Sequence, residues 1–388
     1  MKQWMVFCLS AMVMYGVEFK NEIDFSGIGY NKRHSEVLLS GNSEMTYKRE
    51  GLEAKVRLGY LYSSEYAKRR YLYLNELYVT KDIGSYRIDA GKRILYWGEL
   101  EGYNITDIFN TKNYLKDPFE KAAKLGSWSV SLSHYEGEKV IEAGVKFYEE
   151  RQEFGDVQTP YYPLPLPYDP LLKTQQSRYT PTLYISYAWS SDAIMESESR
   201  VLLWHGYDAK RDFLPADADR LFQYAYRVNK LLLLSHLVYR DTIFKFEGSY
   251  TNVIDYLPMS DYWQIGIGTE QSLYDLGGMD LTIYGEYYAY GYRNRQGHEQ
   301  VDISEIYNDD LFLAFKLDVN DAGSSEVKAG ILYDLGNKEK VFKVQARTRV
   351  MDRFVVYAEV LRLFPAGDTL LDRFDNHTRM TVGVNYTF

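Results

Sequence analysis

The sequence predicts an all-β fold, a closed antiparallel transmembrane β-barrel of about 18 strands, with about 16 strands as the next count. Three observations lead to this prediction. Segments of about ten residues alternate between apolar and polar side chains, as strands with one oily and one wet face do. Short connections between these segments alternate with long ones. The last eleven residues, 378–388, keep the two-residue period up to the carboxyl terminus.

Composition fits a barrel that hides its apolar face from sequence averages. The chain of 388 residues could form one large barrel or two or three soluble domains. Its 38 Tyr, 18 Phe and 6 Trp suit girdles of amphipathic rings at two membrane interfaces. Mean hydropathy is −0.39, and no apolar run of about 18 residues occurs in the body of the chain, which excludes helical membrane spans.

The amino terminus predicts export. Lys2 precedes a mostly apolar run at 4–15, and Gly16 supplies a small residue before the charged residues that follow, a pattern typical of a signal peptide over 1–16. The expected mature chain, 17–388, is then a single barrel domain. Because Cys8 would leave with the signal, this mature chain has no cysteine, which fits an oxidising destination without disulfides.

The predicted strands follow one another along the whole chain. Each is a segment of about ten residues with alternating polarity or enriched in β-branched and aromatic residues. In order they are 18–30, 34–47, 52–63, 68–80, 86–96, 127–135, 139–149, 181–190, 197–207, 227–240, 242–253, 261–273, 279–292, 307–319, 325–335, 340–350, 353–363 and 377–388.

The lengths of the connections give the predicted barrel its orientation. Every even-numbered strand is followed by a short turn, at 48–51, 81–85, 136–138, 191–196, 241, 274–278, 320–324 and 351–352. Every long connection follows an odd-numbered strand, at 97–126, 150–180, 208–226, 293–306 and 364–376. Outer-membrane barrels have short periplasmic turns and long extracellular loops, so this parity predicts an even strand number with both termini in the periplasm.

The last strand should close the barrel by pairing with the first strand near 18–30, with Met380, Val382, Val384 and Tyr386 facing lipid. Its ending, Gly383-x-x-Tyr386-x-Phe388, resembles the carboxyl-terminal assembly signal of bacterial outer-membrane β-barrels. The resemblance implies that the chain is inserted by the barrel assembly machinery and resides among outer-membrane lipids.

The polar face of the strands is expected to line a hydrated lumen, since charges on a dry wall would be prohibitively costly. The candidate pore-lining residues are Glu53, Lys55, Arg57, Arg87, Asp89, Arg93, Lys146, Lys245, Glu247, Glu286, Lys316, Asp318, Glu326, Lys328, Lys343, Arg347, Arg349 and Arg379. Two interpretations of these charges stay open. The cluster Lys343, Arg347 and Arg349, opposite Lys328 and Arg379, could focus the field toward anions, or opposite charges could pair across strands and brace the wall. By its parity Lys92 would face lipid, unless a bulge intervenes or it lies at the interface.

No constellation for bond chemistry stands out. The six histidines are scattered without an i, i+4 ligand pair, and no Gly-x-Ser-x-Gly elbow occurs. We therefore expect no catalytic residues, no metal site and no cofactor, although a triad assembled between strands is defined by geometry and not by sequence. A formal net charge of −9 disfavours nucleic acid as a partner.

The connection after the fifth strand carries the most distinctive motif. It reads Gly91-Lys92-Arg93, then Trp97-Gly98-Glu99, Asn104 and Asp107-Ile108-Phe109-Asn110. This arrangement resembles a segment of large-barrel outer-membrane proteins of the porin superfamily, including alginate-export-like members. The resemblance implies a loop that folds inward and narrows a channel, with Trp97, Glu99, Glu101, Asn104, Asp107 and Asn110 as constriction candidates. An Asn- and Asp-rich run of surface turns is the alternative.

A second loop, 150–180, contains a stiff Pro-rich stretch at 159–170 that could present exposed Tyr and Leu to a sugar or a partner, or cover the barrel mouth. Together these features predict a porin-like channel of the bacterial outer membrane for small polar or anionic solutes. A surface interaction or adhesion barrel with partner-binding loops, and a polysaccharide export barrel, remain as alternatives.

Overall fold

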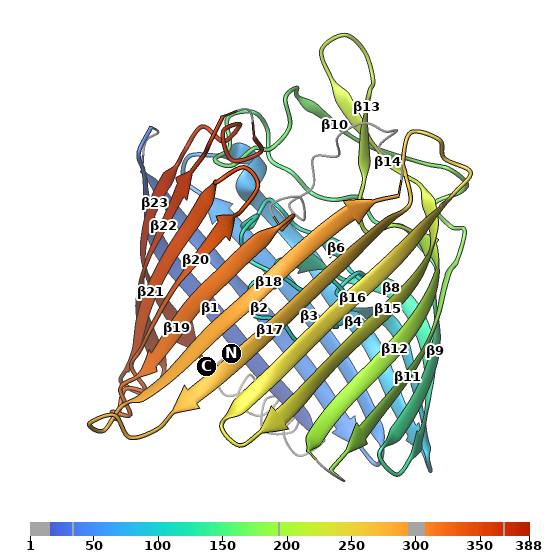
Figure 1. Ribbon diagram of the computed structural model, residues 1–388, viewed down its shortest axis with the longest axis horizontal. Helices are drawn as coiled ribbons and strands as arrows, with labels where there is room; N and C mark the ends of the chain where they lie inside the picture. Colours follow the sequence, from blue (N-terminus) through green and yellow to red (C-terminus); the bar gives the residue numbers. More distant parts are fainter. Residues whose placement is uncertain (1–15, 33–34, 193–194, 294–306, 368) are drawn as a thin grey trace, which may run out of the picture.

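A computed structural model describes residues 16–388 apart from 33–34, 193–194, 294–306 and 368. It shows a closed antiparallel barrel with 18 strands in one sheet, as predicted (Figure 1). The predicted signal peptide lies, except for Gly16, outside the described residues. No helix in the described ranges is long and apolar enough to cross a bilayer.

The barrel strands coincide with the predicted segments to within a few residues. They are β1 (Val17–Tyr30), β2 (Glu36–Arg49), β3 (Leu52–Ser63), β4 (Arg70–Ile83), β5 (Tyr86–Arg93), β8 (Ser127–Glu136), β9 (Lys139–Lys146), β11 (Thr182–Ser191), β12 (Glu196–Tyr207), β15 (Arg227–Tyr239), β16 (Thr242–Ile254), β17 (Tyr262–Leu273), β18 (Asp280–Tyr292), β19 (Asp310–Asp318), β20 (Glu326–Asp334), β21 (Lys340–Val350), β22 (Phe354–Phe364) and β23 (Thr378–Thr387).

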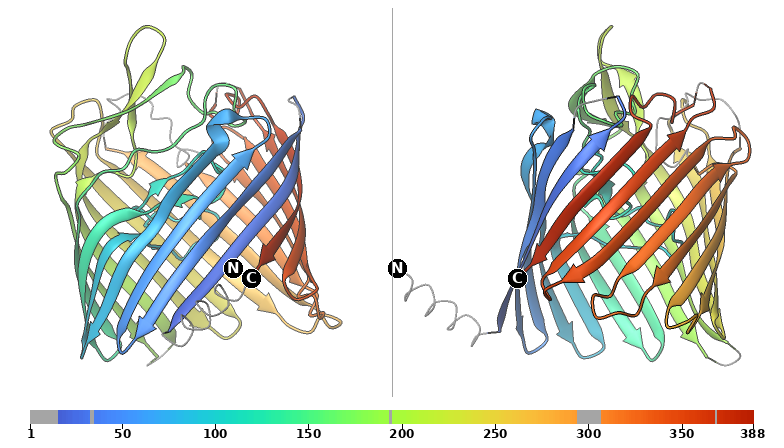
Figure 2. Two further views of the ribbon diagram at one scale, coloured as in Figure 1. Left: turned by 180° about the vertical axis from the view of Figure 1, so that it is seen from behind. Right: turned by 90° about the vertical axis from the view of Figure 1, so that its left-hand side faces the viewer.

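The last strand closes the barrel as expected. β23 pairs with β1, placing Phe25 opposite Val384 and Tyr30 opposite Arg379, and the two strands lie side by side in Figure 2. On β23, Met380 and Val382 are about 60% exposed on the outer face. Gly383 points inward, where a Cβ would lie 2.5 Å from the ring of Tyr357, so this position of the assembly signal has no room for a side chain. Closure leaves the barrel sheet without a free edge.

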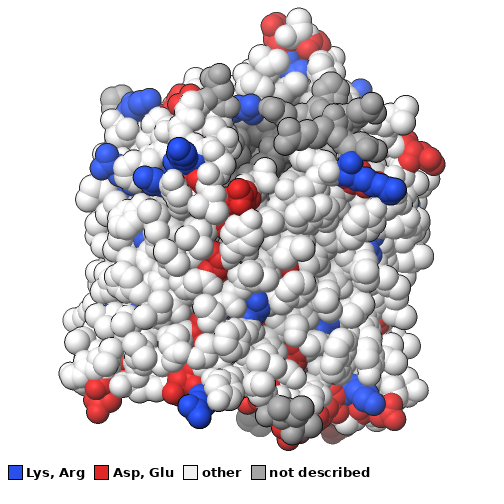
Figure 3. Space-filling view, in the orientation of Figure 1, with Lys and Arg blue, Asp and Glu red and all other residues white. Residues whose placement is uncertain are grey.

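Alternation of side chains divides the wall into two faces. Cross-strand partners share a face, so Glu44 opposite Arg57 places two charges inside, while Met45 opposite Val56 places two apolar side chains outside. Most of the exterior in Figure 3 is uncharged, and charges gather toward the upper and lower rims. Exposed apolar side chains occupy this exterior, among them Phe19, Phe25, Leu39, Leu72, Val79, Ile141, Leu203, Leu231, Ile267, Leu313 and Val382. Such a surface is stable only against lipid.

The connections at the end of the barrel near the termini are short turns, as predicted from the sequence. β2 and β3 are joined by Glu50 and Gly51, both with positive φ (45° and 72°), and β21 and β22 by a turn that includes Met351 and Asp352 at φ 52° each. Two-residue turns with positive φ match the twist of the flanking strands and keep the hairpin tight. These turns lie on the side of the termini, which is the periplasmic side in outer-membrane barrels.

The long loops contain structure that the sequence did not reveal. A short pair, β6 (Thr111–Lys112) with β7 (Lys124–Leu125), lies within the connection after β5. Above the barrel, β10 (Tyr168–Thr174), β13 (Asp212–Pro215) and β14 (Leu221–Ala225) form a separate sheet, in which β10 runs parallel to β14 (Figure 1). A 3₁₀ turn, η1 (Ala67–Arg69), precedes β4.

Candidate functional site: a loop folded into the lumen

The connection after β5 crosses the inside of the barrel. We call residues 94–126 the lumen loop; in Figure 1 its strand β6 lies within the barrel, between the front and back walls. The predicted strand 86–96 ends instead at Arg93, because the chain turns inward there. The backbone N–H of Ile94 donates to Glu76 (3.3 Å), and that of Leu95 donates to the side chain of Asn110 (2.6 Å).

Glu247 on β16 holds the first part of the lumen loop. Its carboxylate accepts the backbone N–H groups of Glu99 (2.6 Å), Leu100 (3.0 Å) and Thr106 (2.9 Å), and the Thr106 hydroxyl at 3.0 Å. The side chain is fully buried, and no cation pairs with it among the described residues. A buried carboxylate is tolerable when several donors satisfy it, so this residue is an anchor for backbone and not an open charge.

Glu286 on β18 supplies a second anchor of the same kind. It accepts the N–H groups of Glu101 (2.6 Å) and Gly102 (2.8 Å), and Tyr288 accepts the N–H of Tyr103 at 2.9 Å. Gly102 is required at this contact because a Cβ there would lie 2.9 Å from the Tyr288 hydroxyl. Two carboxylates on alternate strands therefore fix the loop to the far wall.

Apolar packing fastens the same wall to the loop. Phe109 is completely buried, and its ring meets Trp97 edge-on at 5.4 Å and Trp204 of β12 at 6.2 Å. Tyr184 of β11 completes the aromatic cluster, with Trp97 at 5.4 Å. Burying one Phe side chain contributes roughly 1.5–3 kcal/mol. On this side of the barrel the lumen is therefore filled like an ordinary protein core.

Polar contacts inside the loop set its shape. The Asn110 amide donates to the carbonyls of Arg93 (2.9 Å) and Leu125 (3.0 Å), tying the entry of the loop to its exit. Lys124 is ion-paired with Asp107, and both side chains are buried. Burial lowers the pKa of Lys124 to about 8, against the opposing attraction of Asp107.

On the opposite wall the loop meets charges that remain beside open space. Arg379 of β23 pairs with Asp117 of the loop (2.8 Å) and with Glu359 of β22 (2.6 Å), and Lys343 of β21 also pairs with Glu359 (2.9 Å). Burial alone would raise the pKa of Asp117, but the attraction of Arg379 and Lys343 lowers it to about 2. Arg69, held by Glu36 at 2.6 Å, donates to the loop carbonyls of Leu115 and Lys116.

Three cavities of about 310 Å³ or more border the loop in the described part of the chain. One of about 610 Å³ separates it from β1–β4 and β21–β23; its lining includes seven basic and five acidic side chains among the described residues. A second, of about 310 Å³, adjoins it at Lys343 and Gln345 and is bounded by Tyr103, Phe119 and Phe312. A third, of about 550 Å³, meets the first at Ile94. The open space in the lumen therefore lies on one side, between the loop and the strands β1–β4 and β21–β23.

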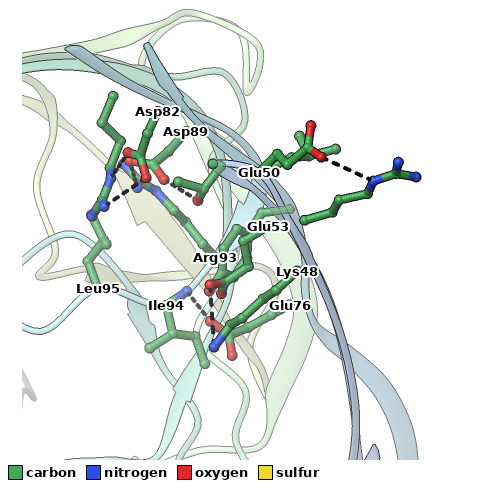
Figure 4. Close-up of a pocket in the computed structure, with 15 residues that line it drawn as sticks. Lys48, Glu50, Glu53, Glu76, Asp82, Asp89, Arg93, Ile94 and Leu95 are labelled. Carbon is green, nitrogen blue, oxygen red and sulfur yellow. Dashed lines mark hydrogen bonds and ion pairs between the residues drawn. The ribbon is translucent and has the colours of Figure 1, made fainter. Parts of the chain in front are cut away.

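Figure 4 shows this third cavity, toward the periplasmic turns. Glu53 and Glu76 point into it beside Lys48, whose ammonium lies 3.8 Å from Glu53. Asp89 and Arg93 line its inner end, and the Arg93–Asp89 pair is 2.9 Å long. Carboxylates and cations both line its wall, so its surface is polar and neither positive nor negative charge dominates.

All predicted pore-lining residues occupy inward strand positions, but they divide into three groups. The first group is ion-paired at or near the cavities: Glu53, Lys55, Arg57, Arg87, Asp89, Arg93, Glu326, Lys328, Lys343, Arg347 and Arg379. The second lies elsewhere on the wall: Lys245, Lys316 and Asp318 are ion-paired there, whereas Arg349 has no ion pair among the described residues. The third, Lys146, Glu247 and Glu286, is buried beneath the loop and does not line the passage.

The predicted constriction residues also fall into two groups, those that contact a cavity or the barrel wall and those that are packed within the loop. Glu101 borders the 310 Å³ cavity and pairs with Lys328, and Glu99 accepts from His236 at 3.0 Å. Trp97, Asp107 and Asn110 lie inside the packing of the loop, and Asn104 contacts Gly98. The charged loop residues that border the larger cavity are others: Lys116, Asp117, Glu120 and the buried Lys124. Sequence reasoning missed them, although they form the most charged stretch of the loop.

Two further expectations are resolved by the geometry. Lys92 does stand on the outer face, opposite Leu77, and pairs with Glu150 at 3.4 Å, so the charge is neutralised at the extracellular rim. The Pro-rich stretch does not expose its rings: Tyr161 and Tyr162 are 5% and 8% exposed. Tyr161 packs on Phe119 of the lumen loop (5.1 Å), which makes this stretch a cover over the mouth.

In the described part of the chain, no group of three or more His, Cys, Asp or Glu side chains is placed to hold a metal ion. Most of the described charged side chains of the lumen pair with one another or bind backbone N–H groups. The site is a set of cavities beside the lumen loop whose walls carry ion pairs.

No protein-family model and no curated protein matches the sequence. Solved structures match the fold over nearly the whole chain. OccAB4 of Acinetobacter baumannii has a TM-score of 0.58 at 9% identity and covers 96% of this chain and 97% of its own. OccK11 (OpdR) of Pseudomonas aeruginosa has 0.56 at 8% identity, covering 96% and 95%, and OpdK of Pseudomonas aeruginosa with vanillate has 0.53 at 10%, covering 96% and 98%. At such identities the likeness concerns the fold: this chain has the 18-stranded barrel fold of outer-membrane porins.

Proposed function

We propose that the protein is a channel of the bacterial outer membrane through which small polar or charged solutes pass passively. The observation that carries the proposal is the lumen loop, which is fastened to one wall and leaves a charged cavity along the other. Eighteen strands enclose a lumen wide enough for water, and the loop reduces it to a passage beside β1–β4 and β21–β23.

The anchoring of the loop favours small solutes over a polymer. Contacts reach the loop from β16 and β18 on one side and from β23 on the other, so opening the full bore would break buried hydrogen bonds and an ion pair together. The remaining cavities measure about 310 to 610 Å³. This geometry supports diffusion of single small molecules and speaks against the polysaccharide export alternative.

Charge preference follows from how the basic side chains are paired. Four of the five members of the basic cluster have a carboxylate partner: Lys343 with Glu359, Arg347 with Glu326, Lys328 with Glu101, and Arg379 with Asp117 and Glu359. The larger cavity keeps a slight basic excess among its described side chains. We infer a weak preference for anions, and vanillate, the small carboxylate bound to OpdK, is a suitable probe.

Conductance in planar bilayers tests the channel. Gln345 borders the two adjoining cavities, whereas its neighbour Val344 faces outward, opposite Val360. Gln345→Trp should lower single-channel conductance several-fold by filling the passage, and Val344→Trp, the matched control, should leave it unchanged. Addition of vanillate to one side should produce blockages or a carboxylate current in the wild type. A protein that inserts but stays electrically silent would refute the proposal.

A further inference from the structure

Basic side chains with aromatic neighbours gather on the outer face at the extracellular ends of β20, β21 and β22. Figure 3 shows Lys and Arg at the upper left, over these strand ends. The rim patch, as we call it, consists of Tyr333, Lys340, Phe342, Arg362 and Phe364. These positions share the outward parity of the apolar belt, whereas Val341 and Leu363 between them point inward.

Strand register gives the rim patch a defined geometry. Lys340 is the cross-strand partner of Phe364, and Phe342 is the partner of Arg362, so cations and rings alternate at the corners of a square. The two cations occupy one diagonal, and diagonal neighbours on a sheet face lie about 7–8 Å apart. That separation lets two flexible cationic side chains approach one anionic group from both sides.

Aromatic rings hold both cations at the surface. The ammonium of Lys340 lies 5.4 Å from the centre of the Tyr333 ring, and the guanidinium of Arg362 lies 4.8 Å from that of Phe364. Phe342 and Phe364 are 36% and 39% exposed, as expected for rings at the level of lipid headgroups. Cation–π contact orders a side chain without neutralising it.

Neither cation has an ion pair with any described carboxylate. The acidic groups nearest in the chain are turned to other partners or inward: Asp309 accepts the hydroxyl of Tyr287 at 2.8 Å, Asp334 is occupied by the backbone and side chain of Asn337, and Glu339 is buried. Of the four inward-facing cations of the same strands, by contrast, three are paired: Lys328, Lys343 and Arg347. The positive charge of the rim patch is therefore available to a ligand outside the barrel.

We propose that the rim patch binds a phosphate group on the headgroup of a glycolipid of the outer leaflet. A phosphate presents several oxygens to the forked donors of Arg362 and to the ammonium of Lys340. The exposed rings beside the cations contact the sugar and the first carbons of the acyl chains. The occupant is a lipid and not a free anion because the patch faces the bilayer, continuous with apolar side chains such as Leu313 and Met380.

Other cation–ring pairs on the barrel lack a second free cation. Arg70 lies 5.0 Å from Tyr62, but its guanidinium donates to the carbonyls of Ser63 and Ser64. Arg240 lies 5.2 Å from Tyr239 at the periplasmic end. The second pair provides a matched control, since it has the same chemistry without a cationic neighbour across the strand.

The test is a titration of the purified full-length barrel in detergent with diphosphoryl lipid A, monitored by native mass spectrometry. Lys340→Gln with Arg362→Gln should weaken binding roughly twenty-five-fold, because each surface cation near a charged lipid contributes about fivefold. Arg240→Gln should bind as the wild type. Phosphatidylethanolamine, which has no net charge, should bind equally to all three proteins, and unchanged conductance and heat-modifiable migration show that each is folded.

Three results would overturn the proposal. Equal binding of diphosphoryl lipid A by the wild type and the double variant would remove the rim patch as the site. Displacement of the lipid by millimolar inorganic phosphate would identify a site for free anions instead of a lipid headgroup. A dephosphorylated lipid A that binds as tightly as the diphosphoryl form would show that the rings alone carry the affinity, which also contradicts the assignment.

Discussion

The two sides of the barrel use the same inward strand positions in opposite ways. Along β11 to β18, inward side chains such as Tyr184, Trp204 and Glu247 are buried against the lumen loop. Along β1–β4 and β21–β23, inward side chains such as Arg57 and Lys343 face a cavity and pair with carboxylates. The comparison teaches that alternation decides which way a residue points, while a loop from elsewhere decides whether that residue meets water.

Removing the carboxylates that anchor the lumen loop to β16 and β18 should give the largest change in conductance. Replacing Glu247 and Glu286 by Ala leaves five backbone N–H groups of the loop without their acceptors, and each lost hydrogen bond to a charged group costs about 1.5–3 kcal/mol. We expect release of the loop, measured as a several-fold rise in single-channel conductance and as new protease cleavage within 94–126.

Glu270→Gln is the matched control for this experiment. Glu270 lies on β17, between the two anchors, and pairs with Lys245 at 2.6 Å without touching the loop. Its replacement should leave conductance near the wild-type value. If the double variant also conducts like the wild type, packing by Phe109 and its neighbours holds the loop without the carboxylates.

Lowering the pH should change conductance through the ion pair of Asp117 with Arg379 on the cavity side. This effect should be smaller than that of removing the two anchors. The pKa of Asp117 is lowered to about 2 in the folded barrel, from 3.8 for an unperturbed side chain. A depressed carboxyl pKa contributes stability above the unfolded value that is lost as pH falls through the folded one, here roughly 2 kcal/mol. The change in conductance that depends on Asp117 should therefore lie below pH 3.

Asp117→Asn should remove this acid transition, since the loop then lacks the charge that pairs with Arg379. A transition of the wild type centred near pH 4 would contradict the argument, because it would mean that Asp117 titrates like a solvated carboxyl.

Neutralising the basic cluster should give the smallest effect. Lys343→Gln, Arg347→Gln and Arg349→Gln together remove three cations, but two of these already have carboxylate partners at 2.9 and 2.7 Å. We expect a shift of the reversal potential toward cations in a salt gradient, by a few millivolts for each replacement. Thr348→Ala, which alters the outward face between two of them, is the control.

The fold was largely predictable from the sequence, whereas the site was predictable only in part. Alternation and the parity of connection lengths are local properties, so they located the 18 strands and the closing pair β1–β23. The burial of Glu247 depends on the N–H groups of Glu99 and Thr106, more than 140 residues away, and no local pattern encodes that meeting. The role of Asp117 was missed for the same reason, since Arg379 is its partner.

The small extracellular sheet was missed for a different reason. β10 contains Pro170 and β13 ends in Pro215, residues that break ladders and therefore indicate loops. They are tolerated because both strands lie at edges of a three-stranded sheet, with β14 between them.

The anchors of the lumen loop also fix an order of events during folding. Leu100 and Gly102 bind side chains that lie 147 and 184 residues later in the chain. Contacts of such sequence separation form late, because the loop closure they require must be achieved first. The loop cannot dock before β16 and β18 stand side by side with β17, so a barrel caught halfway through assembly has its wall but not its constriction. For the proposed channel, docking of the loop should therefore be the last step of maturation and should lower the permeability of the barrel.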